Sequence, residues 1–173
     1  MASDVDAVWE IIHKCSEWLA KELNLDHWLK YYTREMVEKK FENQHVYVAK
    51  KGKTIVGTVT LDENPVEYYT EDDMKNFKKR NAKAVYITAL AVDPDHQGGG
   101  VASQLLKASE QAAMGMEAKY IRFDCRADYK ELIRFYQRRH FMIVGEIIDT
   151  EDNNNVYYLM EKRLGGKQQT TLH

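Results

Sequence analysis

Residues 84–106 read AVYITALAVDPDHQGGGVASQLL and carry the strongest indication of the fold. Its first nine residues are mostly apolar and rich in β-branched side chains, which is typical of a buried strand. Asp93-Pro94 then break the strand, three glycines follow, and apolar residues at three- and four-residue spacing from Val101 predict a helix. A strand that runs through a glycine-rich loop into a helix indicates an α/β protein.

Helices and strands alternate on both sides of this stretch. A polar segment over 62–83 is expected to hold a helical turn or two. Gly115 is expected to be the left-handed residue that follows the helix predicted over 101–114. We expect an α/β (α+β) fold with a mixed central sheet of about six to seven strands flanked by helices. Periodicity predicts helices over 5–23, 29–41, 101–114 and 129–139, and strands over 45–49, 54–61, 84–92, 120–125, 141–148 and 156–162, the first two joined by a turn at Gly52.

Composition limits the class of protein. The chain has 173 residues, 44% of them hydrophobic, which fits one domain with its own core. A net charge of −2 argues against a nucleic-acid partner, and no apolar run approaches the roughly 18 residues that span a membrane. The acidic N-terminus differs from a secretory signal, and the two cysteines form no metal-ligand pattern. We expect a single domain over 1–164, a flexible tail over 165–173, a cytoplasmic location and no metal.

The glycine triplet has the chemistry of a phosphate-binding loop. Glycines let a phosphate approach main-chain N–H groups, and the start of a helix adds unpaired donors. The Gly-Lys-Ser/Thr of a nucleotide P-loop is absent, and the third glycine of a dinucleotide fingerprint is replaced by Ser103. The glycines alone are explained equally well by a tight strand-to-helix turn.

A second motif makes the loop more specific. Gln97-x-x-Gly100-x-Ala102 resembles the Gln/Arg-x-x-Gly-x-Gly/Ala signature of GNAT-type N-acetyltransferases. Downstream, the aromatic helix that ends in Tyr136, followed by Phe141, resembles the second hallmark of that family. The resemblance covers roughly residues 45–162 in the order and type of elements. Two linked motifs in the right structural context carry more weight than either alone.

The resemblance implies acetyl-coenzyme A as co-substrate, with its diphosphate on the 97–102 loop. It implies that the pantetheine arm lies beside the 84–92 strand, where this strand splays from its central neighbour, the 120–125 strand. A backbone N–H near Val92 would polarise the thioester carbonyl, and Tyr136 is the candidate general acid. The implied cofactor-binding residues are Leu90, Ala91, Val92, Gln97, Gly98, Gly99, Gly100, Val101, Ala102 and Ser103.

Three positions depart from the family pattern. Tyr129 stands where relatives often have a cofactor-contacting Asn, and His140 stands where they have glycine. Histidine tolerates a left-handed backbone, so the turn is expected to survive. Thr88 stands where several relatives have a carboxylate base. Two substitutes remain open, either ordered water leading to Glu63, Glu67 or Asp124, or an amine that arrives already neutral.

Several other conspicuous residues are interpreted as structural. Cys125 is expected to be a small core residue and not a nucleophile. The basic run over 75–80 is expected to be a solvated face. Trp9, Trp18 and Trp28 are candidates for core positions or for subunit contacts in a homodimer.

The predicted function is transfer of an acetyl group from acetyl-coenzyme A to a primary amine of a small molecule or peptide, by direct attack in a ternary complex. The alternatives are a non-catalytic acyl-coenzyme A binding module, acting as sensor or scaffold, and a structural interaction domain. The acidic, tyrosine-bearing segment 62–73 suits a cationic acceptor such as a polyamine. An exposed acidic loop explains this segment equally well.

Overall fold

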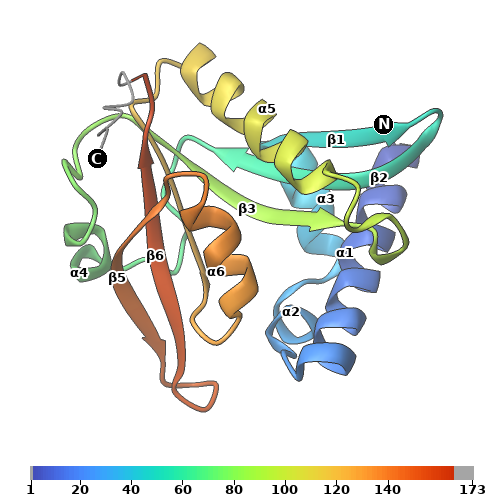
Figure 1. The fold of residues 1–173 in the computed structure, drawn as a ribbon, viewed down its shortest axis with the longest axis horizontal. Helices are drawn as coiled ribbons and strands as arrows, with labels where there is room; N and C mark the ends of the chain where they lie inside the picture. Colours follow the sequence, from blue (N-terminus) through green and yellow to red (C-terminus); the bar gives the residue numbers. More distant parts are fainter. Residues whose placement is uncertain (1, 166–173) are drawn as a thin grey trace, which may run out of the picture. The chain divides into compact units, whose positions relative to one another are not determined.

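The computed structural model describes residues 2–165 and has a mixed α/β architecture (Figure 1). Six strands form one sheet in the order β1-β2-β3-β4-β6-β5. The prediction of a mixed sheet flanked by helices is confirmed. The elements are α1 (Ala2–Leu23), α2 (His27–Tyr31), α3 (Arg34–Asn43), β1 (His45–Lys51), β2 (Thr54–Asp62), α4 (Glu71–Lys75), β3 (Ala84–Val92), the 3₁₀ turn η1 (Pro94–His96), α5 (Val101–Gly115), β4 (Tyr120–Arg126), α6 (Lys130–Gln137), β5 (Met142–Asp149) and β6 (Asn155–Arg163).

The chain forms two compact units. The first unit combines residues up to 62 with 87–109, and the second combines 63–86 with 110 onward. Strand β3 and helix α5 each contribute residues to both units. The parallel ladder between β3 and β4 contains three residue pairs, from Ala84–Tyr120 to Tyr86–Arg122, and all three belong to the second unit.

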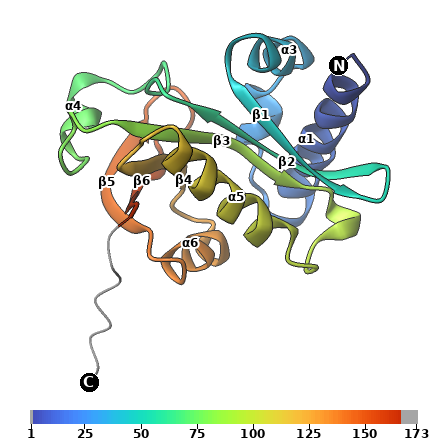
Figure 2. The same ribbon diagram turned by 90° about the horizontal axis from the view of Figure 1, so that it is seen from above.

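The first unit is built on the β1–β2 hairpin, whose turn holds Gly52 at φ +61° as predicted. Helices α1 and α3 cover one face of the hairpin and of the second half of β3, while α5 starts on the other face (Figure 2). The buried core on the α1 and α3 side consists of Val8, Ile11, Ile12, Cys15, Tyr32, Val37, Ala89 and Ala91.

The second unit centres on the antiparallel strands β4, β6 and β5. Arg122 on β4 is fully buried, and its Nε donates to Glu161 Oε2 at 2.9 Å. The guanidinium also donates to the backbone carbonyls of Lys78, Lys79 and Arg80. The basic side chains of the 75–80 run are exposed, as predicted, while the backbone of 78–80 is bound to a buried arginine, which fixes the loop that precedes β3.

The single helix predicted over 29–41 is wrong, because the chain breaks at Tyr32-Thr33 into α2 and α3. Tyr32 is extended, with φ −84° and ψ 130°. Thr33 is the N-cap of α3, and its side chain accepts a hydrogen bond from Met36 N at 3.2 Å. A threonine cap satisfies an otherwise unpaired amide and favours a new helix start over continuation.

The predicted left-handed Gly115 is also wrong, since Glu117 takes that conformation with φ +62°. Ala118 N donates to Ala113 O and Glu117 N to Met114 O, both at 2.9 Å, which is the Schellman pattern. The same pattern closes α6 around His140, at φ +67°, where Phe141 N donates to Tyr136 O. The expectation that His140 preserves this turn is confirmed.

The predicted tail over 165–173 falls almost wholly outside the described residues, which end at 165. The single-domain boundary at 164 stays a prediction.

Candidate active site

The loop between β3 and α5 is anchored at its start by Asp93. The Asp93 carboxylate accepts from Asp95 N at 3.0 Å and pairs with Lys14 Nζ on α1 at 3.4 Å. The backbone carbonyl of Asp93 accepts from His96 N at 2.8 Å. These contacts stabilise the 3₁₀ turn η1 and thereby fix the position of the backbone just before the glycine triplet.

Two of the three glycines are required by the backbone. Gly98 and Gly100 have φ values of +82° and +81°, at which a residue with a side chain is strained. Gly99 has no positive φ. Gly100 O accepts from Gln104 N at 3.0 Å, which starts α5. The amides of Val101 and Ala102 therefore lie in the first turn, where helical N–H groups lack intrahelical partners and the helix dipole is positive.

Gly57 on β2 explains why α5 starts where it does. A Cβ at Gly57 would lie 2.9 Å from Leu105 Cδ1 and 3.0 Å from Val101 Cγ1. The absence of a side chain lets the first turns of α5 pack directly on the sheet, which fixes the helix start beside the loop. No pattern in the sequence pointed to this role of Gly57.

Strand β3 has an irregularity at Ala89, which is buried and has φ +52°. A left-handed residue inside a strand breaks the regular ladder and redirects neighbouring groups. Ala89 packs in the core beneath α1 and α3, and the side chain of Thr88 contacts α3. Thr88 and Ala89 thus lie on one face of the sheet although they are consecutive in the chain.

The peptide groups of Leu90 and Val92 face away from β2. Asp93 N donates to Val56 O at 2.9 Å, and Ala91 O lies 3.1 Å from where a Cβ of Gly57 would be. Residues 91 and 93 therefore direct their amides toward β2, and in an extended strand residues 90 and 92 direct theirs to the opposite side. The three-pair ladder with β4 ends at Tyr86, well before these residues.

Cys15 on α1 binds the carbonyl of Val92, at the end of β3. Its Sγ donates to Val92 O at 3.0 Å. Burial raises the pKa of the Cys15 thiol to about 12, so that the donor proton is retained at neutral pH. The orientation of the Val92 peptide is thereby supported from the α1 side.

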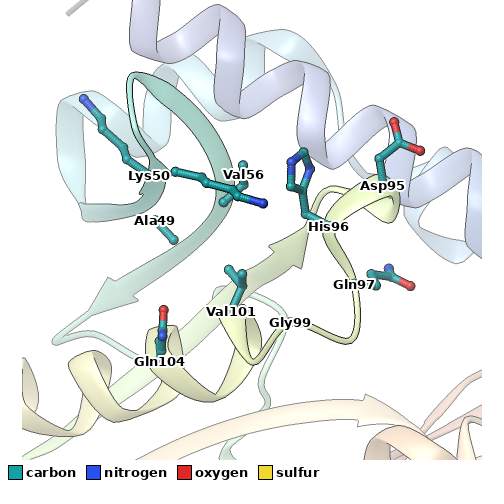
Figure 3. Close-up of a pocket in the computed structure, with 10 residues that line it drawn as sticks. Ala49, Lys50, Val56, Asp95, His96, Gln97, Gly99, Val101 and Gln104 are labelled. Atoms are coloured by element: carbon teal, nitrogen blue, oxygen red, sulfur yellow. The ribbon is translucent and has the colours of Figure 1, made fainter.

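A pocket of about 380 Å³ lies between the end of the β1–β2 hairpin and the glycine loop (Figure 3). Lys50 and Lys51 line it from the hairpin, and Gln97 and Gly99 line it from the loop. The two lysines therefore add positive charge to the lining of a pocket beside a loop whose amides already favour an anion, with Asp95 as an opposing charge. The remaining lining residues are Ala49, Val56, Asp95, His96, Val101 and Gln104.

Thr88, at the strand position where the family resemblance implies a carboxylate in several relatives, accepts a hydrogen bond from a lysine. Lys40 Nζ on α3 lies 2.9 Å from Thr88 Oγ1 and 3.4 Å from Gln44 Oε1. Gln44 Nε2 in turn donates to Asp62 Oδ2 on β2 at 2.6 Å. Burial lowers the pKa of Lys40 from its ordinary 10.5 to about 8, against the opposing charge of Asp62. Lys40 was not among the predicted site residues, because it lies 48 residues before Thr88 in an ordinary helical pattern.

Tyr136, the predicted general acid, lies on α6 in the second unit. It is buried, and its ring centroid lies 4.4 Å from that of Phe123 and 5.9 Å from that of Phe141. Burial raises the pKa of the phenol above its ordinary value, so that it is protonated at neutral pH, as an acid must be. Tyr129 is the N-cap residue of α6.

The three predicted carboxylates of a water relay differ in their surroundings, all within the second unit. Asp124 on β4 accepts from the hydroxyls of Tyr68 at 2.8 Å and Tyr69 at 2.7 Å. Burial raises the pKa of Asp124, although both hydrogen bonds oppose this shift. Glu63 pairs with exposed Lys83 at 3.0 Å, and Glu67 is exposed. Asp124 is therefore the one candidate of the three that is held in a hydrogen-bonded cluster.

Cys125 is buried, and its Sγ lies 3.6 Å from Met160 Sδ. Burial raises the pKa of this thiol to about 12, which keeps it protonated and a weak nucleophile.

Across residues 2–165, no cluster of three His, Cys, Asp or Glu side chains is arranged to hold a metal ion. None of the helices in that range has the length and apolar character needed to span a bilayer.

Comparison with known proteins connects this geometry to a family. The model of the acetyltransferase (GNAT) family matches residues 5–141. The Bacillus subtilis protein YesJ, named an uncharacterized N-acetyltransferase, is 26% identical over 164 residues, covering 93% of this chain and 86% of YesJ. A Listeria monocytogenes acetyltransferase of the GNAT family superposes with a TM-score of 0.73 at 19% identity, covering 94% of this chain and 90% of that one.

A third protein, a putative streptothricin acetyltransferase from Bacillus anthracis, was solved in complex with acetyl coenzyme A. It has a TM-score of 0.55 and 20% identity, covering 70% of this chain and 63% of its own. The chain therefore belongs to the acetyltransferase (GNAT) family and, as the sequence predicts, is an N-acetyltransferase. The space beside Gly98 and Gly100 is open, because a Cβ at either would meet nothing within 4 Å, so that an anionic group has room to approach the loop.

Proposed function

We propose that this protein transfers the acetyl group of acetyl-coenzyme A to a primary amine of a small molecule or peptide, by direct attack in a ternary complex. The observation that carries the proposal is the loop at residues 97–103. Left-handed Gly98 and Gly100 lead into the first turn of α5, and lysines 50 and 51 line the adjoining pocket. Backbone amides, a helix N-terminus and two cations suit a diphosphate.

Strand β3 would hold the pantetheine arm of the co-substrate. Peptide groups of Leu90 and Val92 face away from β2, and a pantetheine amide can pair with them as an added strand does. The thioester lies at the end of the arm opposite the diphosphate. Along β3 it is therefore expected between Val92 and Thr88, within the roughly 13 Å that four strand residues span, and a backbone N–H near Val92 stays the proposed donor to its carbonyl. Acetyl-coenzyme A supplies the activated acyl group, and the chain supplies amide donors that stabilise charge on the carbonyl oxygen.

Tyr136 remains the proposed general acid for the departing thiol. The support is its place in the aromatic motif of α6 together with a protonated phenol at neutral pH. The acceptor is proposed as a primary amine, with polyamines, peptide N-termini and lysine side chains as the classes to compare.

Coenzyme A binding can be tested with a loop variant that leaves the backbone unstrained. Gly99 lacks a positive φ, and a Cβ added there would have His96 O as its nearest neighbour, at 3.7 Å. Gly99→Glu therefore places a charge at the loop without the strain expected at Gly100. Coenzyme A should raise the Tm of the wild type by mass action, and Gly99→Glu should abolish the shift. Gly99→Gln is the control for bulk and should retain much of it. An equal shift in all three proteins would place coenzyme A elsewhere.

Turnover is tested by thiol release from acetyl-coenzyme A with a panel of amines. Spermidine, an N-terminal peptide amine and a lysine-containing peptide represent the three acceptor classes. Coenzyme A binding without thiol release for any amine would favour the binding module over the enzyme. Release dependent on one class identifies the acceptor chemistry.

A further inference from the structure

We propose that Lys40 is the general base of the reaction, accepting a proton from the acceptor amine at the strand position where Thr88 replaces a carboxylate. This inference rests on the proposed function. It starts from the placement of Lys40 Nζ, 2.9 Å from Thr88 Oγ1 on the strand that we propose as the pantetheine site. Helix α3 and strand β3 meet here within the first unit.

The hydrogen bonds of Lys40 suit a neutral amine. A neutral amine has two N–H groups and one lone pair, whereas the ammonium form has three donors and no lone pair. Thr88 Oγ1 and Gln44 Oε1 are two uncharged acceptors, at 2.9 and 3.4 Å. With its two N–H groups directed to them, neutral Lys40 keeps its lone pair for a proton from a third direction.

Asp62 on β2 and Tyr32, which follows α2, are titratable groups near Lys40 Nζ. Asp62 on β2 favours the ammonium form, but it reaches Lys40 through Gln44, whose Nε2 donates to Asp62 at 2.6 Å. The Tyr32 ring centroid lies 5.8 Å from Nζ. Asp62 and Tyr32 can stabilise the ammonium form of Lys40 that results from proton uptake. Burial favours the neutral form, so that the ammonium readily loses its proton again.

The pKa of Lys40, lowered by burial to about 8, places this group in the useful range for a base. At pH 7 about one Lys40 side chain in ten is neutral, against fewer than about one in 10³ for an exposed lysine. A lysine with this pKa therefore does what Thr88 cannot do.

The proton balance closes without another reactant. One proton of the acceptor ammonium passes to Lys40 Nζ. The neutral nitrogen then bonds to the acetyl carbonyl carbon as the carbon–sulfur bond breaks, and its second proton leaves with the thiol of coenzyme A. Lys40 returns its proton to water before the next turnover.

The test compares Lys40→Met with Lys39→Met, a matched change at an exposed neighbour on α3 that pairs with Glu35. Two acceptors are used, an alkylamine, protonated at neutral pH, and a fluorinated amine whose own pKa lies well below that of Lys40. For the alkylamine, wild-type kcat/KM should rise with pH through an inflection near 8 that Lys40→Met removes, with a loss on the order of 10²-fold. For the fluorinated amine, already neutral, the loss should be only a few-fold.

Lys40→Arg keeps a cation that cannot deprotonate, and it should behave like Lys40→Met. Titration of the Lys40 side chain by ¹H–¹³C NMR in the wild type provides a readout independent of turnover and should give a midpoint near 8, unlike Lys39. The Tm shift with coenzyme A should be the same in all variants.

Equal losses with both amines in Lys40→Met, or a retained inflection near 8, would overturn the role of Lys40 while leaving the acetyltransferase function intact. Acetylation of Lys40 itself, seen by mass spectrometry, would make it a nucleophile and also overturn the proposal. Absence of thiol release by the wild type with every amine would instead overturn the proposed function, and with it the role of Lys40.

Discussion

Arg122 in the second unit is fully buried and Lys40 in the first is partly buried, and the two cations differ in their partners. Arg122 is fully buried, pairs with Glu161 at 2.9 Å, donates to three backbone carbonyls and lies 4.8 Å from the Phe77 ring centroid. The hydrogen bonds of Lys40 to Thr88 and Gln44 end on neutral oxygens.

The difference separates a structural cation from a candidate functional one. A buried charge that is paired and fully hydrogen-bonded is stable in its charged form. A buried amine with uncharged partners lowers its pKa instead, which is a property typical of functional sites. Arg122 fixes a loop, and Lys40 is poised to exchange a proton.

The largest expected effect follows from breaking the Arg122 pair. Arg122→Met leaves Glu161 buried without its cation, and loss of one partner of a buried pair costs about 3–5 kcal/mol. Urea unfolding should show this loss in the free energy of unfolding. Replacing both residues, as Arg122→Met with Glu161→Met, should recover much of it.

Lys83→Met is the control for this experiment, since Lys83 pairs with Glu63 at the surface, where such pairs contribute about 0–1 kcal/mol. A loss below about 1 kcal/mol in Arg122→Met would mean that the buried pair does not stabilise the second unit.

The opposite sign is expected for Lys40→Met at neutral pH. The folded pKa of Lys40, about 8, lies below its ordinary value of 10.5, so the charged form is disfavoured by folding. The unfolded state therefore binds more protons between pH 8 and 10.5, and removing the amine should stabilise the fold by about 1–3 kcal/mol below pH 8. The gain should disappear above pH 10.5.

Chemical unfolding of the wild type, Lys40→Met and Lys39→Met at pH 7 and about pH 10.5 checks this prediction. A destabilised Lys40→Met at neutral pH would show that the Lys40 hydrogen bonds outweigh the burial of its charge. Stability given up at one residue is a recurrent feature of active sites.

Tyr136 extends the comparison to an uncharged polar group packed among aromatic rings. Tyr136→Phe removes only the hydroxyl, so the contacts with Phe123 and Phe141 should persist and Tm should change little. If the phenol is the acid, kcat should fall on the order of 10²-fold, with little change in coenzyme A affinity. An unchanged kcat with a lowered Tm would assign Tyr136 to the core alone.

The fold was largely predictable because its strands and helices carry strong periodicity, and β3 has the predicted bounds of 84–92. The errors fell at helix ends, where one side chain or one left-handed residue decides. Thr33 splits the helix predicted over 29–41 in two by capping the start of α3. Glu117 takes the left-handed position predicted for Gly115, because a Schellman closure accepts a residue other than glycine there.

The site was predictable only where its residues are contiguous in sequence. The loop over 97–103 is one segment, so its pattern is visible. Lys40 and Gln44 have a typical helical spacing and become notable only once folding brings Thr88 beside Lys40. Lys50 and Lys51 likewise look like ordinary hairpin residues until the pocket unites them with Gln97.

A small effect on coenzyme A affinity is expected for the exposed lysines Lys50 and Lys51. They test whether exposed cations, unlike buried ones, contribute to binding in this protein. Lys50→Gln with Lys51→Gln removes two charges from the wall of the pocket that holds Gln97 and Gly99. Exposed charges are screened by salt, so coenzyme A should bind about 2- to 5-fold more weakly at low ionic strength, with the difference fading near about 1 M salt. Isothermal titration at two salt concentrations measures this, with Lys53→Gln in the same hairpin as the control. A loss that persists at high salt would mean that the lysines donate specific hydrogen bonds to the ligand, and no loss at either concentration would place the phosphates away from this pocket.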